Sequence, residues 1–225
     1  MNIELVVFDL AGTTVNDEDG VNRAVREALA AEGVSVSREA VNQVMGIPKP
    51  VALRRLIEGA GRGDLLTRLD TIHNDFVARM IRFYRQDPSV YEIAGSTDVF
   101  RRLRAAGIYV VLDTGFTRDI VEVILDRLAW KNPDLVNLTV TSDEVARGRP
   151  HPDMIAKAMA ELGVRDAQRV AKVGDTPADL EEGMRAGCGM VVGVTRGSHT
   201  AEQLQACPHT HLIGSVVELP GLLGL

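Results

Sequence analysis

The pattern of hydrophobic positions divides the chain into two kinds of region. Residues 3–8 form a short, nearly continuous apolar run that ends at Asp9, and similar short runs recur from Gly95 onward. Apolar runs of this length are typical of strands buried on both faces of a parallel sheet. The runs after Gly95 alternate with stretches that have apolar residues at helical spacing, and this alternation predicts a parallel sheet with helices on both faces.

The intervening part of the chain, from about Asp19 to Tyr84, has only helical patterns. We expect four helices there: one from Val21 that closes near Gly33, one capped by Ser37, one at 48–60 and one at 64–85. After Gly95 we expect helices at 97–106, 118–128, 153–162 and 178–186, and strands at 108–113, 136–141, 170–173 and 190–194.

The helical block is best explained as an insertion after the first strand. The sequence therefore predicts an α/β fold, with a three-layer, Rossmann-like parallel-sheet core domain and an inserted all-helical cap domain. We assign residues 1–15 plus 92–225 to the core domain and residues 16–91 to the cap domain.

Composition narrows the functional classes without selecting one. The chain has 225 residues, of which 45% are hydrophobic and 25% charged, so it can bury a full core. Its formal charge of −6 argues against a general nucleic-acid binder. The sequence shows neither a signal-peptide pattern nor an apolar run near 18 residues, so we expect a cytoplasmic protein that does not bind a membrane. Cys188 and Cys207 fit no metal or redox spacing and are expected to be free thiols.

The end of the first strand combines a carboxylate with groups that can bind an anion. Asp9 stands at the carboxyl end of the strand, where open α/β sheets bind their ligands. Gly12, Thr13 and Thr14 follow and offer backbone N–H groups and hydroxyls. The alternative is that Asp9 only caps the next helix.

Three further stretches place polar residues at other predicted strand ends. Thr114 and Gly115 follow one strand, although a threonine there can also serve as a simple cap. Arg149 lies between Gly148 and a proline, which suits a fixed phosphate ligand better than a solvated side chain. Asp175 and Asp179 are spaced four residues apart around a helix start, and with Asp9 they form a plausible site for Mg²⁺.

Together these motifs resemble the haloacid dehalogenase superfamily over essentially the whole chain. The residues that carry the resemblance are Asp9-Leu-Ala-Gly-Thr-Thr, Thr114-Gly, Arg149-Pro and Gly174-Asp-Thr-x-x-Asp179. Within it, the chain looks most like the phosphonatase (phosphonoacetaldehyde hydrolase) branch. Ala11 stands where most of the superfamily's phosphatases have an aspartate, and Arg149 stands where they have a lysine.

A segment of the helical block strengthens this resemblance. Met45-Gly-Ile-Pro-Lys49 is similar to the phosphonatase segment whose lysine forms a Schiff base with the substrate aldehyde. Lys49 lies between two prolines near a helix start, where the helix dipole should lower its pKa and favour the neutral nucleophile. The alternative is an ordinary surface lysine, although the chain has only four lysines against twenty-one arginines.

The resemblance implies a catalytic arrangement. Lys49 would form an imine, and Asp9 would then attack phosphorus. In the iminium ion the electrons of the carbon–phosphorus bond can move to the cationic nitrogen, so the leaving group is an enamine. An enamine needs no proton from the enzyme, and no acid is needed at position 11, where the chain has Ala11. Mg²⁺ would be held by Asp9, the Ala11 carbonyl and Asp175, with Asp179 beside them. The groups implied for binding the phosphonyl oxygens or the substrate are Arg149, Thr114, Gly115, Gly46 and the amides of Gly12 and Thr13. A homodimer through the cap is also implied.

Two departures leave the substrate open. Ala52 replaces the histidine that follows the Schiff-base lysine by three residues, and acidic residues around Asp17 and Asp19 replace a cysteine of the first linker. We therefore expect a 2-oxoalkylphosphonate, phosphonoacetaldehyde or a close analogue. The alternatives are a Mg²⁺-dependent phosphatase for a small phosphoester, in which Lys49 only binds the substrate, and a non-catalytic binding module. His151, beside Arg149, could lie at the substrate's edge.

Overall fold

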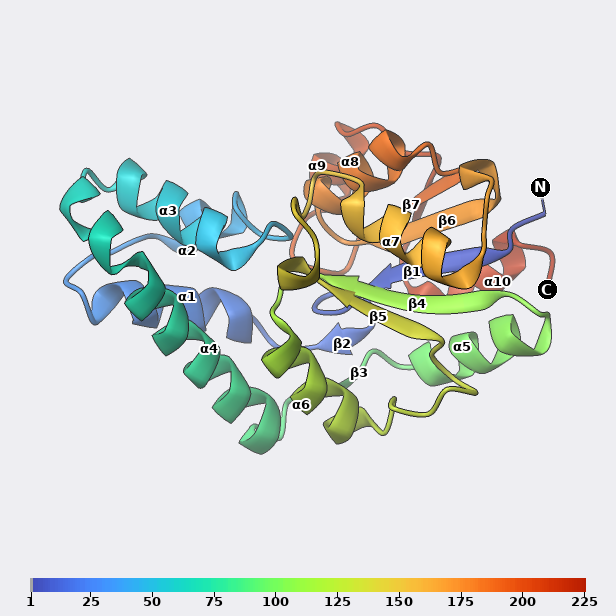
Figure 1. Cartoon of the computed structure of the whole chain (residues 1–225), viewed down its shortest axis with the longest axis horizontal. Helices are drawn as coiled ribbons and strands as arrows, with labels where there is room; N and C mark the ends of the chain where they lie inside the picture. Colours follow the sequence, from blue (N-terminus) through green and yellow to red (C-terminus); the bar gives the residue numbers. More distant parts are fainter. Residues whose placement is uncertain (1) are drawn as a thin grey trace.

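A computed structural model describes residues 2–225 and contains a six-stranded parallel sheet. The strand order is β5-β4-β1-β6-β7-β8 (Figure 1). The strands are β1 (Leu5–Asp9), β4 (Tyr109–Thr114), β5 (Leu138–Thr141), β6 (Val170–Gly174), β7 (Met190–Val194) and β8 (His211–Ile213). This arrangement confirms the predicted α/β fold with a parallel sheet.

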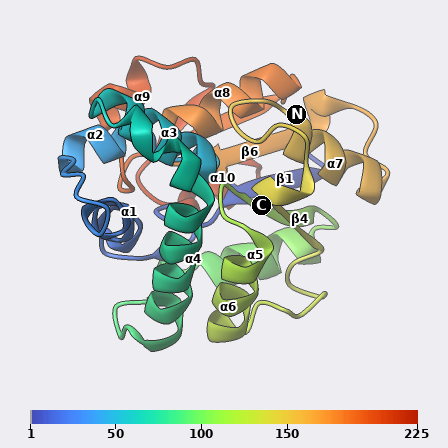
Figure 2. The same ribbon diagram turned by 60° about the vertical axis from the view of Figure 1, so that its left-hand side comes forward.

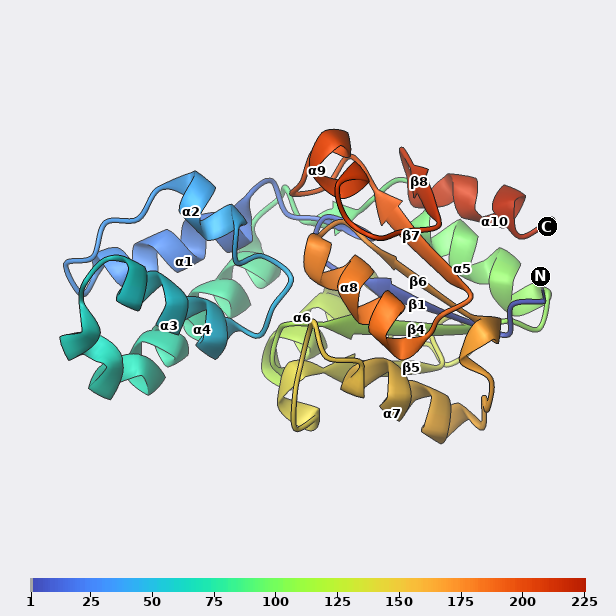
Figure 3. The ribbon, with the colours of Figure 1, turned by 90° about the horizontal axis from the view of Figure 1, so that it is seen from above.

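Alternating side chains of the strands fill two hydrophobic layers. In β1, Leu5 and Val7 pack on one side of the sheet, and Val6 and Phe8 pack on the other. The first layer is closed by α7 (Asp153–Leu162), α8 (Pro177–Ala186) and α9 (Ala201–Gln205), and the second by α5 (Ser96–Ala105), α6 (Arg118–Leu128) and α10 (Leu219–Leu222). Figure 3 shows α7, α8 and α9 together over one face. The sheet is therefore covered on both faces, as predicted.

The helical segment lies beside the edge at which the core strands end (Figure 1). It comprises α1 (Gly20–Ala30), α2 (Arg38–Asn42), α3 (Lys49–Gly59), the 3₁₀ helix η1 (Gly63–Arg68) and α4 (Leu69–Gln86). Helix α4 packs against α6 of the core, and Figure 2 shows the two side by side. Two short antiparallel strands, β2 (Val15–Asn16) and β3 (Tyr91–Glu92), join this segment to the core. That residues 16–91 act as a separate cap domain stays a prediction.

The structure differs from the sequence prediction where elements are short. The helix predicted at 64–85 begins as η1 and becomes α-helical only at Leu69, because the two helix types place apolar residues at similar spacing. Strands β2 and β3 have two residues each, too few for an alternation to be visible. The elements after β7 were not predicted, and neither were the short helices η2 (Ser142–Glu144), η3 (Ala167–Arg169) and η4 (Val216–Glu218).

Two other local predictions, the Ser37 cap and the free cysteines, are confirmed. The Ser37 side chain accepts a hydrogen bond from the Ala40 amide at 3.1 Å and so caps α2. Cys188 and Cys207 are free thiols. Within residues 2–225, no helix combines the length and the apolar character needed to cross a membrane.

Candidate active site

The sheet register brings the predicted strand-end residues to one edge. Strand β1 pairs with β4 so that Asp9 lies opposite Asp113, and it pairs with β6 so that Phe8 lies opposite Val173. Asp9 therefore ends its strand between the turns that carry Thr114 and Asp175. Because the strands are parallel, these turns all leave the sheet on the same side.

Three buried carboxylates form the first feature of this edge. The side chains of Asp9, Asp175 and Asp179 offer oxygen atoms that all lie within 4.8 Å of one another. Asp175 accepts hydrogen bonds from the Thr13 hydroxyl at 3.1 Å and from the Ser198 amide and hydroxyl at 2.6 and 2.7 Å. The same aspartate packs so closely on Gly12 (φ 88°) that a Cβ there would lie 2.5 Å from its carboxylate.

The electrostatics of this cluster suit a divalent cation. Burial raises the pKa of Asp9 to about 8 although Arg149 opposes the shift, and burial together with the charge of Asp179 raises the pKa of Asp175 to about 6. A hard cation with oxygen ligands would relieve this repulsion among desolvated carboxylates. The donor set therefore fits a metal ion. Asp179 is additionally fixed by the amide and hydroxyl of Thr176, which donate to its carboxylate at 3.2 and 2.5 Å.

Arg149 and Lys172 form the second feature, a buried network of charges. The guanidinium of Arg149 has no exposed surface and lies 2.7 Å from Asp9, 2.6 Å from Asp113, 2.8 Å from Asp179 and 3.0 Å from Glu182. Lys172 Nζ contacts Asp113 and lies 3.2 Å from Asp179 and 3.1 Å from Glu182. The carboxylates of Asp113, Asp179 and Glu182 thus have a resident ammonium group between them.

Lys49, the first residue of α3, is the third feature. Its side chain is buried, with 4% of the residue exposed, and Nζ donates to the Ile47 carbonyl at 3.4 Å. The amine also lies 5.3 Å from the centre of the Phe116 ring. Burial lowers the pKa of Lys49 to about 8, and the charge of Asp9 only partly opposes this shift. The interpretation as a surface lysine is therefore wrong, and burial, not the helix start, is the main cause of the lowered pKa.

A cavity of about 220 Å³ between the helical segment and the sheet edge joins these features. The predicted site residues that line it are Asp9, Ala11, Gly12, Gly46, Lys49, Thr114, Gly115 and Arg149. Among residues 2–225, the cavity lining does not include Thr13, Asp175 or Asp179. Arg38 and Arg196 also border the cavity, as do the consecutive acidic residues 17–19. The structure thus brings Lys49 of the helical segment and Asp9 of the sheet to one space.

The glycines predicted at the site have different surroundings. A Cβ at Gly46 would lie 2.2 Å from the Thr176 hydroxyl, and one at Gly115 would lie 2.7 Å from the Ile47 carbonyl oxygen. These two glycines allow the turn before α3 to sit directly on the core. The Gly12 amide donates to Val15 O at 2.9 Å, so it is not a free donor for a phosphonyl oxygen.

The Thr13 amide is also already used, because it donates to the Leu10 carbonyl at 3.2 Å. The Thr13 hydroxyl instead orients Asp175. The predicted role of these two amides is therefore not supported by the hydrogen bonds of the structure. Thr114, the last residue of β4, lines the cavity, and its hydroxyl accepts a hydrogen bond from the Phe116 amide at 3.3 Å.

Comparison with known families agrees with this geometry. The family model for haloacid dehalogenase-like hydrolases matches residues 3–187. The chain belongs to the haloacid dehalogenase-like hydrolases. Phosphonoacetaldehyde hydrolase from Bacillus cereus (strain B4264) is 32% identical over 227 residues, covering 94% of this chain and 84% of that protein.

Two solved structures extend the comparison. The crystal structure of a phosphonoacetaldehyde hydrolase-like protein from Oleispira antarctica has a TM-score of 0.85 at 25% identity, covering 100% of this chain and 92% of that chain. CbbY from Rhodobacter sphaeroides in complex with phosphate has a TM-score of 0.81 at 20% identity, covering 99% of this chain and 100% of that chain. The second likeness shows the fold alone.

Sequence reasoning missed three charged residues of this haloacid dehalogenase-like hydrolase. Asp113, Lys172 and Glu182 complete the network around Arg149 but were given no role. The signal was present, because Lys172 interrupts an apolar strand and a charge buried in a sheet requires a partner. Glu182 follows Asp179 by three residues, which places both on one face of α8.

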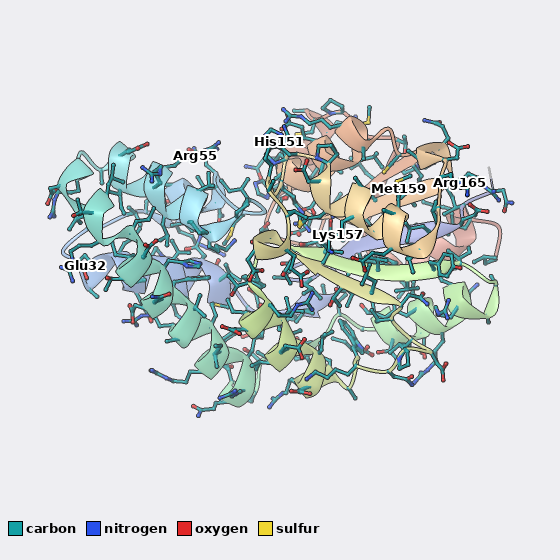
Figure 4. All side chains as sticks on the ribbon, viewed as in Figure 1. Glu32, Arg55, His151, Lys157, Met159 and Arg165 are labelled. Carbon is teal, nitrogen blue, oxygen red and sulfur yellow. The ribbon has the colours of Figure 1, made fainter. Side chains whose placement is uncertain are left out.

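His151 was predicted at the substrate's edge. It lies in the loop before α7, at the end of the core that faces the helical segment (Figure 4). Within the described part of the chain, it is not among the residues that line the cavity.

Proposed function

We propose that this haloacid dehalogenase-like hydrolase cleaves the carbon–phosphorus bond of a 2-oxoalkylphosphonate, phosphonoacetaldehyde or a close analogue. One observation carries the proposal: the Lys49 amine is buried at a cavity that Asp9 also lines, and burial lowers its pKa to about 8. An amine with that pKa is available as a neutral nucleophile near neutral pH. A phosphoester phosphatase in which Lys49 only binds the substrate would have no need of a neutral amine.

The first chemical stage takes place at Lys49. The neutral amine attacks the substrate carbonyl, water leaves, and an iminium ion remains. The cationic nitrogen can then accept the electrons of the carbon–phosphorus bond, so the organic fragment leaves phosphorus as an enamine that is still bound to Lys49. This leaving group does not need a proton from the enzyme, which agrees with the presence of Ala11, whose side chain carries no acid. Protonation of this enamine on carbon and hydrolysis of the resulting iminium ion release the carbonyl product and regenerate the amine.

The second stage takes place at Asp9. Its carboxylate attacks phosphorus as the carbon–phosphorus bond breaks, and water later hydrolyses the aspartyl-phosphate. Thr114 and Arg149 are the groups proposed to bind the phosphonyl oxygens; both border the cavity, and Arg149 would exchange its contact with Asp9 for the phosphonyl group. Asp9, the Ala11 carbonyl and Asp175 would hold Mg²⁺, with Asp179 beside them, and the ion would offset the repulsion between the attacking carboxylate and the phosphonate.

The similarity to phosphonoacetaldehyde hydrolases supports this assignment of the reaction class. Ala52 distinguishes the chain from the pattern expected of that branch, because it provides no titratable group near Lys49. We therefore propose a 2-oxoalkylphosphonate as the class of substrate and leave its carbon skeleton to a substrate panel.

Trapping with borohydride tests the proposal. The protein is incubated with phosphonoacetaldehyde and Mg²⁺, reduced with sodium borohydride and digested, and the peptides are analysed by mass spectrometry. We expect the two-carbon adduct on Lys49. Lys49→Arg should lose the adduct and lose carbon–phosphorus cleavage by more than about 10⁴-fold, on the scale of removing a covalent nucleophile. Lys157→Arg, on α7, is the matched control and should behave like the wild-type protein.

The same experiment separates the alternatives. If Lys49 carries no adduct while p-nitrophenyl phosphate is hydrolysed in a Mg²⁺-dependent reaction, the protein is a phosphoester phosphatase and the imine route is refuted. If the protein hydrolyses neither phosphonates nor phosphoesters, the result favours the alternative that it is a non-catalytic binding module.

A further inference from the structure

The imine stage needs a group that moves protons at Lys49, and this inference rests on the proposed function. The amine must lose a proton before it attacks, and the carbinolamine hydroxyl must gain one before it leaves as water. Ala52, which lies one turn along α3 from Lys49, has a methyl side chain and cannot do this. Another side chain at the cavity must therefore supply the acid and base.

Asp17 is placed at the cavity with Lys49 and Asp9. It lies in the segment between β2 and α1, where the chain passes from the sheet to the helical segment (Figure 3). Its carboxylate accepts a hydrogen bond from the Val21 amide at 3.2 Å, which fixes it at the start of α1. Burial raises the pKa of Asp17, and the positive charge of Lys49 acts in the opposite direction. The geometric observation is that Asp17 and Lys49 line the same cavity.

The backbone around Asp17 is strained. Glu18 and Asp19 both have left-handed conformations, with φ of 42° and 69°. Non-glycine residues rarely adopt this conformation, because it is sterically unfavourable for a side chain. The turn therefore holds a costly conformation in the segment that presents the Asp17 carboxylate to the cavity.

The neighbouring carboxylates are engaged elsewhere. Asp19 forms an ion pair with Arg38 at 3.0 Å, and Glu18 is exposed to solvent. Asp9 is held by Arg149 at 2.7 Å and belongs to the acidic cluster. Asp179, whose charge also reaches Lys49, has its carboxylate bound by Thr176, Arg149 and Lys172.

Two titratable groups of α4 also face this region. His73 Nε2 is buried and has no hydrogen-bond partner among residues 2–225, but His73 does not line the cavity. The Tyr84 hydroxyl is likewise buried without a partner in the described chain, and its ring packs on Phe116 at 6.0 Å. Burial, followed by the charges of Asp17 and Asp9, raises the pKa of Tyr84 well above its ordinary value. Tyr84 therefore stays protonated and cannot act as the base.

We propose that the Asp17 carboxylate is the acid–base group for imine formation at Lys49. It takes a proton from the Lys49 ammonium group, and the freed lone pair forms a carbon–nitrogen bond as the carbonyl π electrons move to oxygen. It relays a second proton from nitrogen to that oxygen. As the Asp17 carboxylic acid, it then protonates the hydroxyl, which leaves as water while the nitrogen lone pair forms the iminium double bond. The net change is ammonium plus carbonyl to iminium plus water, with the carboxylate regenerated.

The test measures imine formation separately from phosphorus chemistry. Acetaldehyde, which has a carbonyl group but no phosphonate, is trapped on Lys49 with borohydride at a series of mixing times, in parallel with phosphonoacetaldehyde. We expect Asp17→Asn to slow the formation of the adduct about 100-fold, at the lower end of the effect of removing an acid–base group. Asp17→Ala should show the same loss, and added formate should restore part of the rate only in this variant.

Two controls match the change. Glu18→Gln alters the adjacent carboxylate at the cavity, and His73→Gln alters the histidine of α4; both should trap acetaldehyde at the wild-type rate. Circular dichroism checks that each variant is folded, and formate rescue of Asp17→Ala could not arise from a purely structural defect.

The outcomes keep the two proposals apart. If the wild-type protein forms the adduct on Lys49 and both Asp17 variants form it equally fast, the role of Asp17 is overturned while the imine route stands. If the wild-type protein forms no adduct with either aldehyde, the proposed function itself fails. A loss in both Asp17 variants, without any rescue by formate, also contradicts proton transfer by Asp17 and points to a structural role.

Discussion

Lys49 and Lys172 are both buried, yet the structure treats their charges in opposite ways. Residue exposure is 4% for Lys49 and 0% for Lys172. Burial lowers the pKa of Lys49 to about 8. For Lys172, burial and Arg149 also act to lower the pKa, but Asp113, Glu182 and Asp179 outweigh them and the pKa is raised. Loss of water is common to both sites, so the carboxylate partners decide which amine stays charged.

The contacts explain the difference atom by atom. Lys172 Nζ lies between three carboxylates, whereas Lys49 Nζ has one backbone carbonyl and the face of an aromatic ring. Lys172 therefore acts as a fixed cation inside the core. Lys49, in contrast, lines a cavity and has a pKa of about 8, so a fraction of its amine is neutral near pH 7. The same residue type serves structure in one region and, in our proposal, chemistry in the other.

Removing Lys172 gives the largest expected effect. Lys172→Met leaves three buried carboxylates with Arg149 as their remaining cation, and breaking a buried ion pair in this way costs about 3–5 kcal/mol in the free energy of unfolding. Urea unfolding followed by circular dichroism measures this loss. The control Lys157→Met, which removes the exposed partner of Glu161 on α7, should leave the unfolding free energy nearly unchanged. Equal stabilities of the two variants would contradict the role given to Lys172.

The pH dependence of stability gives the next largest effect. The pKa of Lys49 is about 8 in the folded protein and near 10.5 when the chain is unfolded. Between these values the unfolded state binds more protons, so stability rises with pH, by about 3 kcal/mol over the window. Lys49→Met has no amine at this position and should lack that rise.

Urea unfolding at several pH values between 7 and 10.5 provides the measurement, expressed as wild-type minus variant stability. Taking this difference cancels the groups that titrate equally in both proteins. The difference should be most unfavourable to the wild type below pH 8 and should shrink as the pH increases. Parallel curves would show that Lys49 is not desolvated as described.

The two lysines also show what could and could not be predicted from the sequence. Apolar periodicity was enough for the parallel sheet, and α6, α7 and β7 begin and end at the expected residues. The strand-end motifs led to Asp9, Thr114 and Arg149, because a parallel sheet gathers strand ends at one edge. Contacts between distant segments could not be predicted in the same way. The placement of Lys172 among carboxylates of β4 and α8 depends on strand order, and the burial of Lys49 depends on how the turn before α3 packs on Gly115.

A divalent cation should distinguish the two acidic clusters. Lys172 contacts all three carboxylates of the cluster Asp113, Asp179 and Glu182, whereas in the cluster Asp9, Asp175 and Asp179 it contacts Asp179 alone among the three. Mg²⁺ at about 100 times its dissociation constant should therefore stabilise the protein by about 2.7 kcal/mol through the second set. Thermal unfolding with Mg²⁺ or with EDTA measures this effect.

Variants identify the cluster that is responsible. Asp175→Asn should abolish the Mg²⁺-dependent stabilisation, because it removes a ligand that lies outside the Lys172 contacts. Glu182→Gln should keep it. Stabilisation that survives in Asp175→Asn and disappears in Glu182→Gln would place the metal at the wrong cluster and refute the assignment.

The smallest effect comes from the aromatic ring beneath Lys49. The Phe116 ring, 5.3 Å from Nζ, favours the ammonium form through a cation–π interaction worth about 0.5–1 kcal/mol. Phe116→Leu removes this preference and should lower the pKa of Lys49 by a further ~0.5 pH units, read from the pH dependence of acetaldehyde trapping. Phe116→Tyr keeps the ring and should keep the pKa. An upward shift in Phe116→Leu would mean that water now reaches the amine, in which case the ring acts on Lys49 by excluding solvent and not by contact with its charge.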